Sequence, residues 1–315
     1  MQTVITSSPA EAAEFIKRGG IVAFPTETVY GLGANVFDTA AVAKIFEAKR
    51  RPADNPLIAH IANLEQVHEL ALEVTESAEK FIQHFFPGPL TVVLKKKNAV
   101  PTIATAGLDT IGIRMPKFGI ANQFLRACGV PVVAPSANIS GSPSPTTFYA
   151  VLEDLDERID CILKGEPTEI GLESTVVDCS GDAPQLLREG AVSLKQLRSV
   201  VREVSGIVSS QDAPRSPGMR HRHYSPAAKV VLIDRGGERM PNVEGSSGAY
   251  IGVKKPEGDF RLVKICSSVE DYAHSVFEFF RECDRVGIKA IYCETVKETG
   301  IGSALMDRLQ RSAES

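Results

Sequence analysis

Cationic side chains and small hydroxyl or amide side chains follow apolar stretches of this chain. Lys49, Arg50 and Arg51 end one amphipathic segment, and Ser136 and Asn138 follow a short apolar run. The three cations alone would also suit a solvated helix C-terminus. Arginine and lysine neutralise anionic oxygens, whereas hydroxyls, amides and exposed backbone N–H groups donate hydrogen bonds to them. Because open α/β sheets bind ligands at strand ends, the pattern indicates a site for a small anion such as a nucleoside triphosphate.

Further polar groups could complete such a site. The stretch from Phe24 to Gly31 (FPTETVYG) offers two hydroxyls and a carboxylate after an apolar run, although a capped strand-to-helix turn is equally consistent with it. Arg114 shares one face of an expected strand with Thr110, so it is either an edge charge or a clamp for a carboxylate. His60 in an apolar strand is either a ligand contact or a buried core histidine.

The elements that position these residues alternate between strand-like and helix-like segments, which predicts an α/β domain. Ser8 and Asp38 are suited to cap helices. The expected strands are 21–24, 57–61, 90–94, 110–114, 131–134, 159–163 and 174–178, and the expected helices are 11–18, the segment from Asp38 through Lys49, 65–72, 77–86, 121–128 and 192–204.

The composition changes after this region. Residues 205–227 are rich in Ser, Pro, Gly and Arg without periodicity, which is typical of a linker. Strand-like runs at 230–234, 249–253 and 290–293 then alternate with helical runs at 269–285 and 301–311, which predicts a small doubly wound domain. The predicted division is a domain at 1–204, a linker or lid at 205–227 and a second domain at 228–315.

Composition excludes several classes of protein. Over 315 residues, 35 basic residues face 39 acidic ones, so the net charge of −4 argues against a general nucleic-acid coat. Six cysteines stand singly, which suggests neither a disulfide framework nor a zinc ribbon. No signal-peptide pattern and no apolar run of membrane-spanning length occur, so we expect a soluble, cytoplasmic protein with no membrane association.

The usual nucleotide and hydrolase signatures are also missing. The sequence contains no G-x-x-x-x-G-K-[ST], no H-E-x-x-H, no G-x-S-x-G and no kinase motif set. Gly31-Leu-Gly33 and Gly300-Ile-Gly302 lack the third glycine of a dinucleotide fingerprint and are more typical of turn or helix-packing glycines. Any nucleotide would therefore be bound without a standard phosphate loop.

Several ordered motifs resemble those of the YrdC-type threonylcarbamoyl-AMP synthases. They are FPTETVYGLGA, Lys49-x-Arg51, NPLIAHI, Ser136-x-Asn138, LESTVVD (172–178) and LLREG (186–190), and they span about residues 5–205. SPGMRHRHYSP and GIGSALMDRL resemble the long, two-domain branch of that family. The resemblance implies a YrdC-like twisted mixed sheet with helices around a basic concave cavity, plus a small Rossmann-like α/β C-terminal domain.

The resemblance also implies an activity and its residues. The family joins L-threonine, bicarbonate and ATP into threonylcarbamoyl-AMP and releases pyrophosphate, and a separate transferase then modifies the adenosine next to the anticodon of certain tRNAs. By motif match, the catalytic tetrad would be Lys49, Arg51, Ser136 and Asn138. Further ATP contacts would be Asn55, Thr110, Ser144, Arg188 and either His223 or Tyr224. The threonine pocket would contain Thr28, His60, Arg114, Ala134 and Ser174.

The residue types fit these roles without a nucleophilic side chain. Attack of a threonine carbamate on the α-phosphate needs in-line positioning and charge neutralisation, with Mg²⁺ accompanying ATP through ligands that the sequence leaves unknown. The linker could close over the site as a lid, and His221-x-His223 could alternatively bind a metal. The rival class is an RNA-binding module with weak tRNA contact, and a third interpretation makes the C-terminal domain a docking domain for partners.

Overall fold

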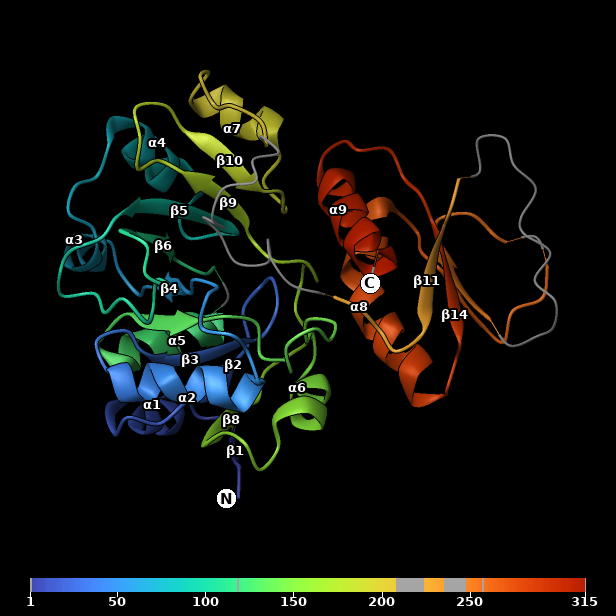
Figure 1. Ribbon diagram of the computed structural model, residues 1–315, viewed down its shortest axis with the longest axis horizontal. Coiled ribbons are helices and arrows are strands. Elements are labelled where there is room, and N and C mark those ends of the chain that lie inside the picture. The colour runs from blue at the N-terminus through green and yellow to red at the C-terminus, as the bar shows by residue number, and fades with distance from the viewer. Residues whose placement is uncertain (1, 118, 208–223, 235–247, 257, 315) are drawn as a thin grey trace.

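A computed structural model describes residues 2–117, 119–207, 224–234, 248–256 and 258–314. Within these residues the strands form two sheets, one of ten strands and one of four (Figure 1). Every strand of the larger sheet precedes residue 189, and every strand of the smaller sheet follows residue 228. The chain thus builds two α/β units in succession.

The larger sheet is mixed, with the order β1-β8-β2-β3-β7-β4-β6-β5-β9-β10. It contains parallel pairs such as β4 with β6 as well as antiparallel pairs such as β5 with β6. Its strands are β1 (Val4–Thr6), β2 (Val22–Phe24), β3 (Gly31–Asn35), β4 (Ile58–His60), β5 (Leu90–Lys95), β6 (Thr110–Arg114), β7 (Val132–Ala134), β8 (Cys161–Leu163), β9 (Thr175–Asp178) and β10 (Gln185–Arg188).

Apolar helix faces cover both sides of this sheet. The helices α1 and α5 pack together in one core with Phe24 and Leu163, whereas α2, α4, α6 and α7 contribute to the other core with Tyr30 and Val92. Ser8 and Asp38 cap α1 and α2 as the sequence predicts, each accepting backbone N–H groups of the first turn. The helices are α1 (Pro9–Lys17), α2 (Thr39–Lys49), α3 (Glu65–Leu70), α4 (Glu76–Phe85), α5 (Gly119–Cys128), α6 (Phe148–Leu155) and α7 (Leu194–Val200).

The smaller sheet is entirely parallel, with the order β11-β14-β12-β13. Two helices, α8 and α9, lie between this sheet and the first domain (Figure 1), and their apolar residues share one core with the sheet. Both helices that the structure describes here therefore cover the same face, which differs from a doubly wound unit. The elements are β11 (Lys229–Ile233), β12 (Ala249–Gly252), β13 (Leu262–Ile265), α8 (Val269–Arg285), β14 (Ala290–Glu294) and α9 (Ile301–Ala313).

All the predicted strands and helices are present within a few residues, and the predicted mixed α/β architecture is confirmed. The sequence analysis missed β1, β3, β10, β13 and α6. Strand β3 was not predicted because its two glycines suggested a turn. In the structure, a Cβ on Gly33 would lie only 2.6 Å from Val132 Cγ1 on β7, so the glycine allows the two strands to pack closely. Gly33 therefore packs against side chains of β2 and β7, so neither the turn nor the helix-packing interpretation is correct for it. The boundaries at 204 and 227 remain predictions.

Candidate functional site

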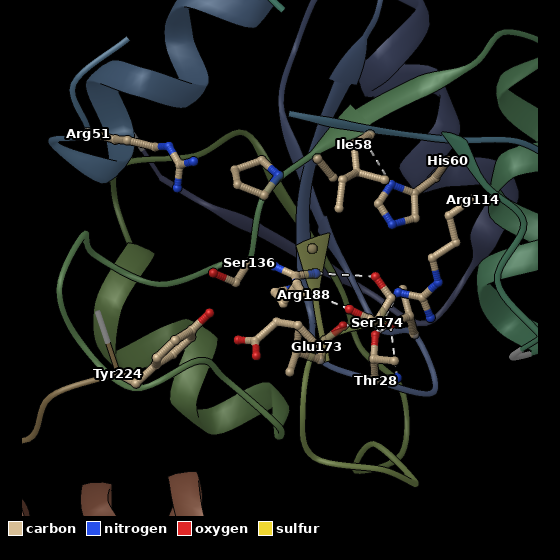
Figure 2. Close-up of a pocket in the computed structure, with 15 residues that line it drawn as sticks. Thr28, Arg51, Ile58, His60, Arg114, Ser136, Glu173, Ser174, Arg188 and Tyr224 are labelled. Carbon is tan, nitrogen blue, oxygen red and sulfur yellow. Dashed lines mark hydrogen bonds between the residues drawn. The ribbon is translucent and has the colours of Figure 1, made fainter. Parts of the chain in front are cut away.

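A pocket with an empty volume of about 580 Å³, open solvent at its mouth included, lies where strands of the larger sheet end. We call its two groups of side chains in Figure 2 the Arg114 end (Thr28, His60 and Arg114) and the Arg51 end (Arg51, Ser136 and Tyr224). The predicted site residues that line it are Thr28, Arg51, His60, Arg114, Ala134, Ser136, Ser174, Arg188 and Tyr224.

Arg114 is the last residue of β6 and is 3% exposed. Its Nη1 donates to Thr28 Oγ1 at 2.7 Å, its Nε donates to the Gly88 carbonyl at 3.2 Å, and its Nη2 lies 2.7 Å from Glu27 Oε1. These three partners fix the plane of the guanidinium. The edge-charge interpretation is wrong, because β6 lies between β4 and β5 and the side chain is buried.

The loop that presents Thr28 is folded by the neighbouring hydroxyl of Thr26. Thr26 Oγ1 accepts from the Thr28 backbone N–H at 3.2 Å, donates to the Val29 carbonyl at 2.7 Å and lies 2.8 Å from Thr28 Oγ1. The strand β3 follows at Gly31, so the interpretation as a strand-to-helix turn is wrong. The hydrogen bonds of the Thr26 side chain therefore stabilise a loop between two strands and do not cap a helix.

His60 ends β4 and is a buried pocket residue. Its Nδ1 lies 3.1 Å from the Ile58 carbonyl, and its ring meets Phe24 edge-on at 5.6 Å between centroids. Burial, assisted by the positive charge of Arg114, lowers the pKa of His60 to about 3. The imidazole is therefore neutral near pH 7 and can hydrogen-bond a neutral hydroxyl without adding charge.

The Arg51 end carries positive charge as well, whereas the charge of Arg114 is paired with Glu27. Burial lowers the pKa of Arg51 to about 10, which still leaves the guanidinium protonated at neutral pH. Its Nη2 lies 3.4 Å from the Asn55 carbonyl. Between the two ends, Arg188 donates from Nε to the Ser174 carbonyl at 3.1 Å and from Nη2 to Ser174 Oγ at 3.3 Å. Together with Arg114, three guanidinium groups therefore line one pocket, and those of Arg51 and Arg188 suit a polyanion.

Three predicted residues lie behind the pocket wall rather than in it. The buried Lys49 ammonium donates to the carbonyl oxygens of Ser136 (2.6 Å) and Asn138, and burial together with Arg51 holds the pKa of Lys49 well below its usual value. The Asn138 amide donates to the carbonyls of Ile139 and Ser142, both at 2.8 Å. The Ser144 hydroxyl donates to Glu173. Lys49, Asn138 and Ser144 thus shape the loop that presents Ser136.

The remaining predictions fall at the margins of the site. Asn55 is 1% exposed, and neither atom of its side-chain amide has a hydrogen-bond partner among the described residues, which is unusual for a buried amide. Thr110 lines a smaller neighbouring pocket of about 260 Å³ that shares Ile58 with the first. His223 lies outside the described residues. Tyr224, its neighbour, does line the pocket, and its ring stacks on Phe277 at 5.4 Å between centroids.

Sequence reasoning missed six lining residues. Each of them lies in a motif quoted above or directly after a predicted strand. Their position in the motifs could have indicated them, but the sequence does not show which side chains point into the pocket. These residues are Thr26, Val29, Gly31, Ile58, Pro135 and Glu173.

Glu173 is the carboxylate that lines this pocket. Burial alone would raise the pKa of its carboxyl, but Arg308 and Arg188 outweigh that effect and the pKa lies below its usual value. No group of three or more His, Cys, Asp or Glu side chains suited to a metal occurs in the described part of the chain.

None of the helices in the described ranges is long and apolar enough to cross a membrane.

Comparisons with known proteins match both units. A family model for Sua5, YciO and YrdC proteins, described as "Telomere recombination", matches residues 14–190. A second model, described as "Threonylcarbamoyl-AMP synthase, C-terminal domain", matches residues 192–314. The resemblance stated from the motifs is confirmed by both matches.

Relatives match nearly the whole chain. A threonylcarbamoyl-AMP synthase of Pyrococcus abyssi (strain GE5 / Orsay) is 43% identical over 96% of this chain and 93% of its own length. A threonylcarbamoyl-AMP synthase of Bacillus subtilis (strain 168) is 40% identical over 96% of this chain and 92% of its own length. The crystal structure of P. abyssi Sua5 complexed with L-threonine superposes with a TM-score of 0.90 at 42% identity, covering 99% of this chain and 97% of that one. The chain therefore belongs to the Sua5–YciO–YrdC family, in the form that carries a threonylcarbamoyl-AMP synthase C-terminal domain.

Proposed function

We propose that this protein is an L-threonylcarbamoyladenylate synthase, a nucleotidyltransferase that joins L-threonine, bicarbonate and ATP into threonylcarbamoyl-AMP and pyrophosphate. The names of the relatives and the threonine complex of P. abyssi Sua5 support it. The observation that carries it is the single pocket in which the Arg114 end and the Arg51 end face one another (Figure 2). A small zwitterion and a polyphosphate need these two kinds of surface side by side.

Threonine would occupy the Arg114 end. Thr28 and His60 offer hydrogen bonds to the substrate hydroxyl, and Ala134 and Ser174 complete the wall. All three guanidinium nitrogens of Arg114 already have partners. The substrate carboxylate would therefore share Arg114 with these partners and would not bind an unoccupied pair of N–H donors. A substrate of this size leaves the Arg51 end for the nucleotide.

The phosphates of ATP would lie against Arg51, Ser136 and Arg188, with Tyr224 beside them. Asn55 and Thr110 are further candidates for nucleotide contacts, Asn55 because its buried amide offers an unused donor and acceptor. Mg²⁺ would enter with ATP, held by phosphate oxygens and water, and neutralise part of the phosphate charge. Lys49, Asn138 and Ser144 would act through the loop that they support.

The reaction follows from this placement. Bicarbonate takes up a proton and loses water to give carbon dioxide, and the neutral threonine amine adds to it and loses a proton to give a carbamate. One carbamate oxygen then bonds to the α-phosphorus while the bond from that phosphorus to the departing pyrophosphate breaks. The side chains contribute position and charge neutralisation through Arg51 and Arg188, and no covalent enzyme intermediate is required. The mixed anhydride would pass to a separate transferase that modifies tRNA, which implies action in the cytoplasm.

Pyrophosphate release from ATP tests the proposal, with threonine and bicarbonate omitted in turn. Release that requires both supports the synthase. Release that needs neither indicates an ATPase, and no release in any mixture favours the rival RNA-binding module. Serine should replace threonine with a loss of about 1–3 kcal/mol in specificity, and valine should be rejected more strongly because it leaves the hydroxyl partners unpaired.

A further inference from the structure

A buried arginine of the C-terminal domain reaches the wall of the site. Arg308 on α9 is 1% exposed, and its Nε lies 3.1 Å from Glu173 Oε2 in the first domain. Its Nη2 donates to the Glu189 carbonyl at 3.0 Å, and its Nη1 pairs with Asp307 at 2.7 Å. The guanidinium also lies 5.4 Å from the centre of the Tyr224 ring. Such a guanidinium is stable only with its partners in place, because an unpaired buried charge is costly.

Two of these partners are themselves pocket residues. Glu173 and Tyr224 both line the site, and Figure 2 shows the Glu173 carboxylate directed between Tyr224 and Ser136. The other oxygen of Glu173 accepts from Ser144. Tyr224 is a non-glycine residue at φ 65°, and its carbonyl accepts from Ser312 of α9 at 3.0 Å. Arg308 therefore contacts the Arg51 end of the pocket from behind.

A second arginine connects the C-terminal domain to the same end. Arg281 on α8 donates to the Pro143 carbonyl and pairs with Asp154 at 2.8 Å. Asp154 in turn accepts the Ile139 backbone N–H at 3.1 Å. These contacts hold the loop between Ser136 and Ser144 against α8.

The Arg114 end is built differently. The polar contacts described above for Thr28, His60 and Arg114 all come from residues of the first domain, including Glu27 and Gly88. The contacts of Arg308 and Arg281 with the pocket wall thus fall on the Arg51 end. Helix α8 reaches the Arg114 end only indirectly, because His274 Nε2 lies 2.8 Å from the Thr168 carbonyl, and Gly171 of the same segment donates its backbone N–H to the Thr28 carbonyl.

We propose that Arg308 is a positioning residue through which the C-terminal domain sets nucleotide affinity and leaves threonine affinity unchanged. The inference rests on the proposed function, since it takes the Arg51 end as the nucleotide end. Arg308 acts by holding Glu173 and Tyr224 in the pocket wall, and it touches no substrate itself.

The test compares Arg308→Met with Arg285→Met in the full-length protein. Arg285 also crosses between the domains, pairing with Glu153 at 2.8 Å, but it is 40% exposed and its ion pairs, with Glu153 and Glu278, involve no pocket residue. Arg308→Lys serves as a milder variant that keeps the charge on Glu173 paired and loses the planar fork. The dissociation constants of α,β-methylene-ATP and of L-threonine are measured separately by calorimetry, after circular dichroism has verified folding.

We expect Arg308→Met to weaken the nucleotide analogue by roughly 3- to 30-fold and threonine by less than about twofold. Arg308→Lys should fall between Arg308→Met and wild type, and Arg285→Met should match wild type for both ligands. Equal weakening of both ligands, or an Arg308→Met protein indistinguishable from Arg285→Met, overturns the proposal. If Arg308→Met does not fold, the same comparison of the loss in nucleotide affinity with the loss in threonine affinity is made for Arg308→Lys.

Failure of the proposed function would show differently. A wild-type protein that binds both ligands and releases no pyrophosphate refutes the synthase assignment, while the comparison of the two dissociation constants still decides the role of Arg308.

Discussion

Glu27 Oε1 and Arg114 Nη2 lie 2.7 Å apart, with side chains 3% and 4% exposed. Glu27 comes from the loop between β2 and β3, and Arg114 ends β6, so the pair joins two separate parts of the sheet. Glu27 is not among the residues that line the pocket. Its carboxylate compensates the buried guanidinium from behind while Nη1 of Arg114 contacts Thr28. A buried cation beside a substrate site needs such a counter-charge in the absence of substrate.

Replacing Glu27 by glutamine tests this pairing. Removal of one partner of a buried ion pair leaves an uncompensated charge, so we expect Glu27→Gln to lower the free energy of unfolding by about 3–5 kcal/mol. Glu76→Gln is the control, because it breaks the exposed pair with Lys80 and should cost at most about 0.5 kcal/mol. Urea denaturation measures both. A Glu27→Gln protein as stable as the control would show that the pair contributes little.

The buried imidazole of His60 predicts a pH dependence of stability. Its pKa is about 3 in the folded protein, against 6.5 ordinarily, because of burial and Arg114. The unfolded chain takes up this proton below pH 6.5 and the folded chain does not, so the contribution of His60 is complete above 6.5 and is lost as pH falls toward 3. One such group adds a slope of up to about 1.4 kcal/mol per pH unit in that window.

Urea denaturation between pH 4 and pH 8 measures that slope as the difference between wild type and His60→Asn. The exposed His84→Asn is the matched control. A wild-type minus His60→Asn difference that stays constant across this range would contradict the low pKa of His60.

The motif residues could be predicted from sequence because their types and spacing fix what they can bind. Their roles within the site could not, because those depend on contacts distant in the sequence. Lys49 and Arg51 are both cationic residues of one motif. The Lys49 ammonium is bound by backbone carbonyls, whereas the Arg51 guanidinium lines the pocket. The partnership of Glu173 with Arg308 joins residues 135 positions apart, and no local pattern encodes it.

Gly190 closes the LLREG motif against the pocket wall. A Cβ there would stand 2.3 Å from the Thr175 nitrogen and 2.7 Å from the Glu173 carbonyl oxygen, both of them backbone atoms. Gly190→Ala must therefore displace the segment that carries Ser174, and we expect a loss of about 1–3 kcal/mol in stability together with weaker threonine binding. Gly181→Ala is the control, because nothing lies within 4 Å of its Cβ. Equal melting temperatures for the two variants would disprove the close approach.

Lys49 should act through the loop that it supports. Lys49→Met leaves the carbonyls of Ser136 and Asn138 buried without their donor, at about 1–3 kcal/mol for each unsatisfied group. We expect synthase activity to fall at least roughly tenfold because Ser136 moves. Lys44→Met, on the same helix, removes an exposed ammonium that donates to the Gly19 carbonyl at 2.7 Å and should leave activity unchanged. Pyrophosphate release measures both variants, and full activity of Lys49→Met would eliminate Lys49 from the site, whether as a phosphate contact or as a support.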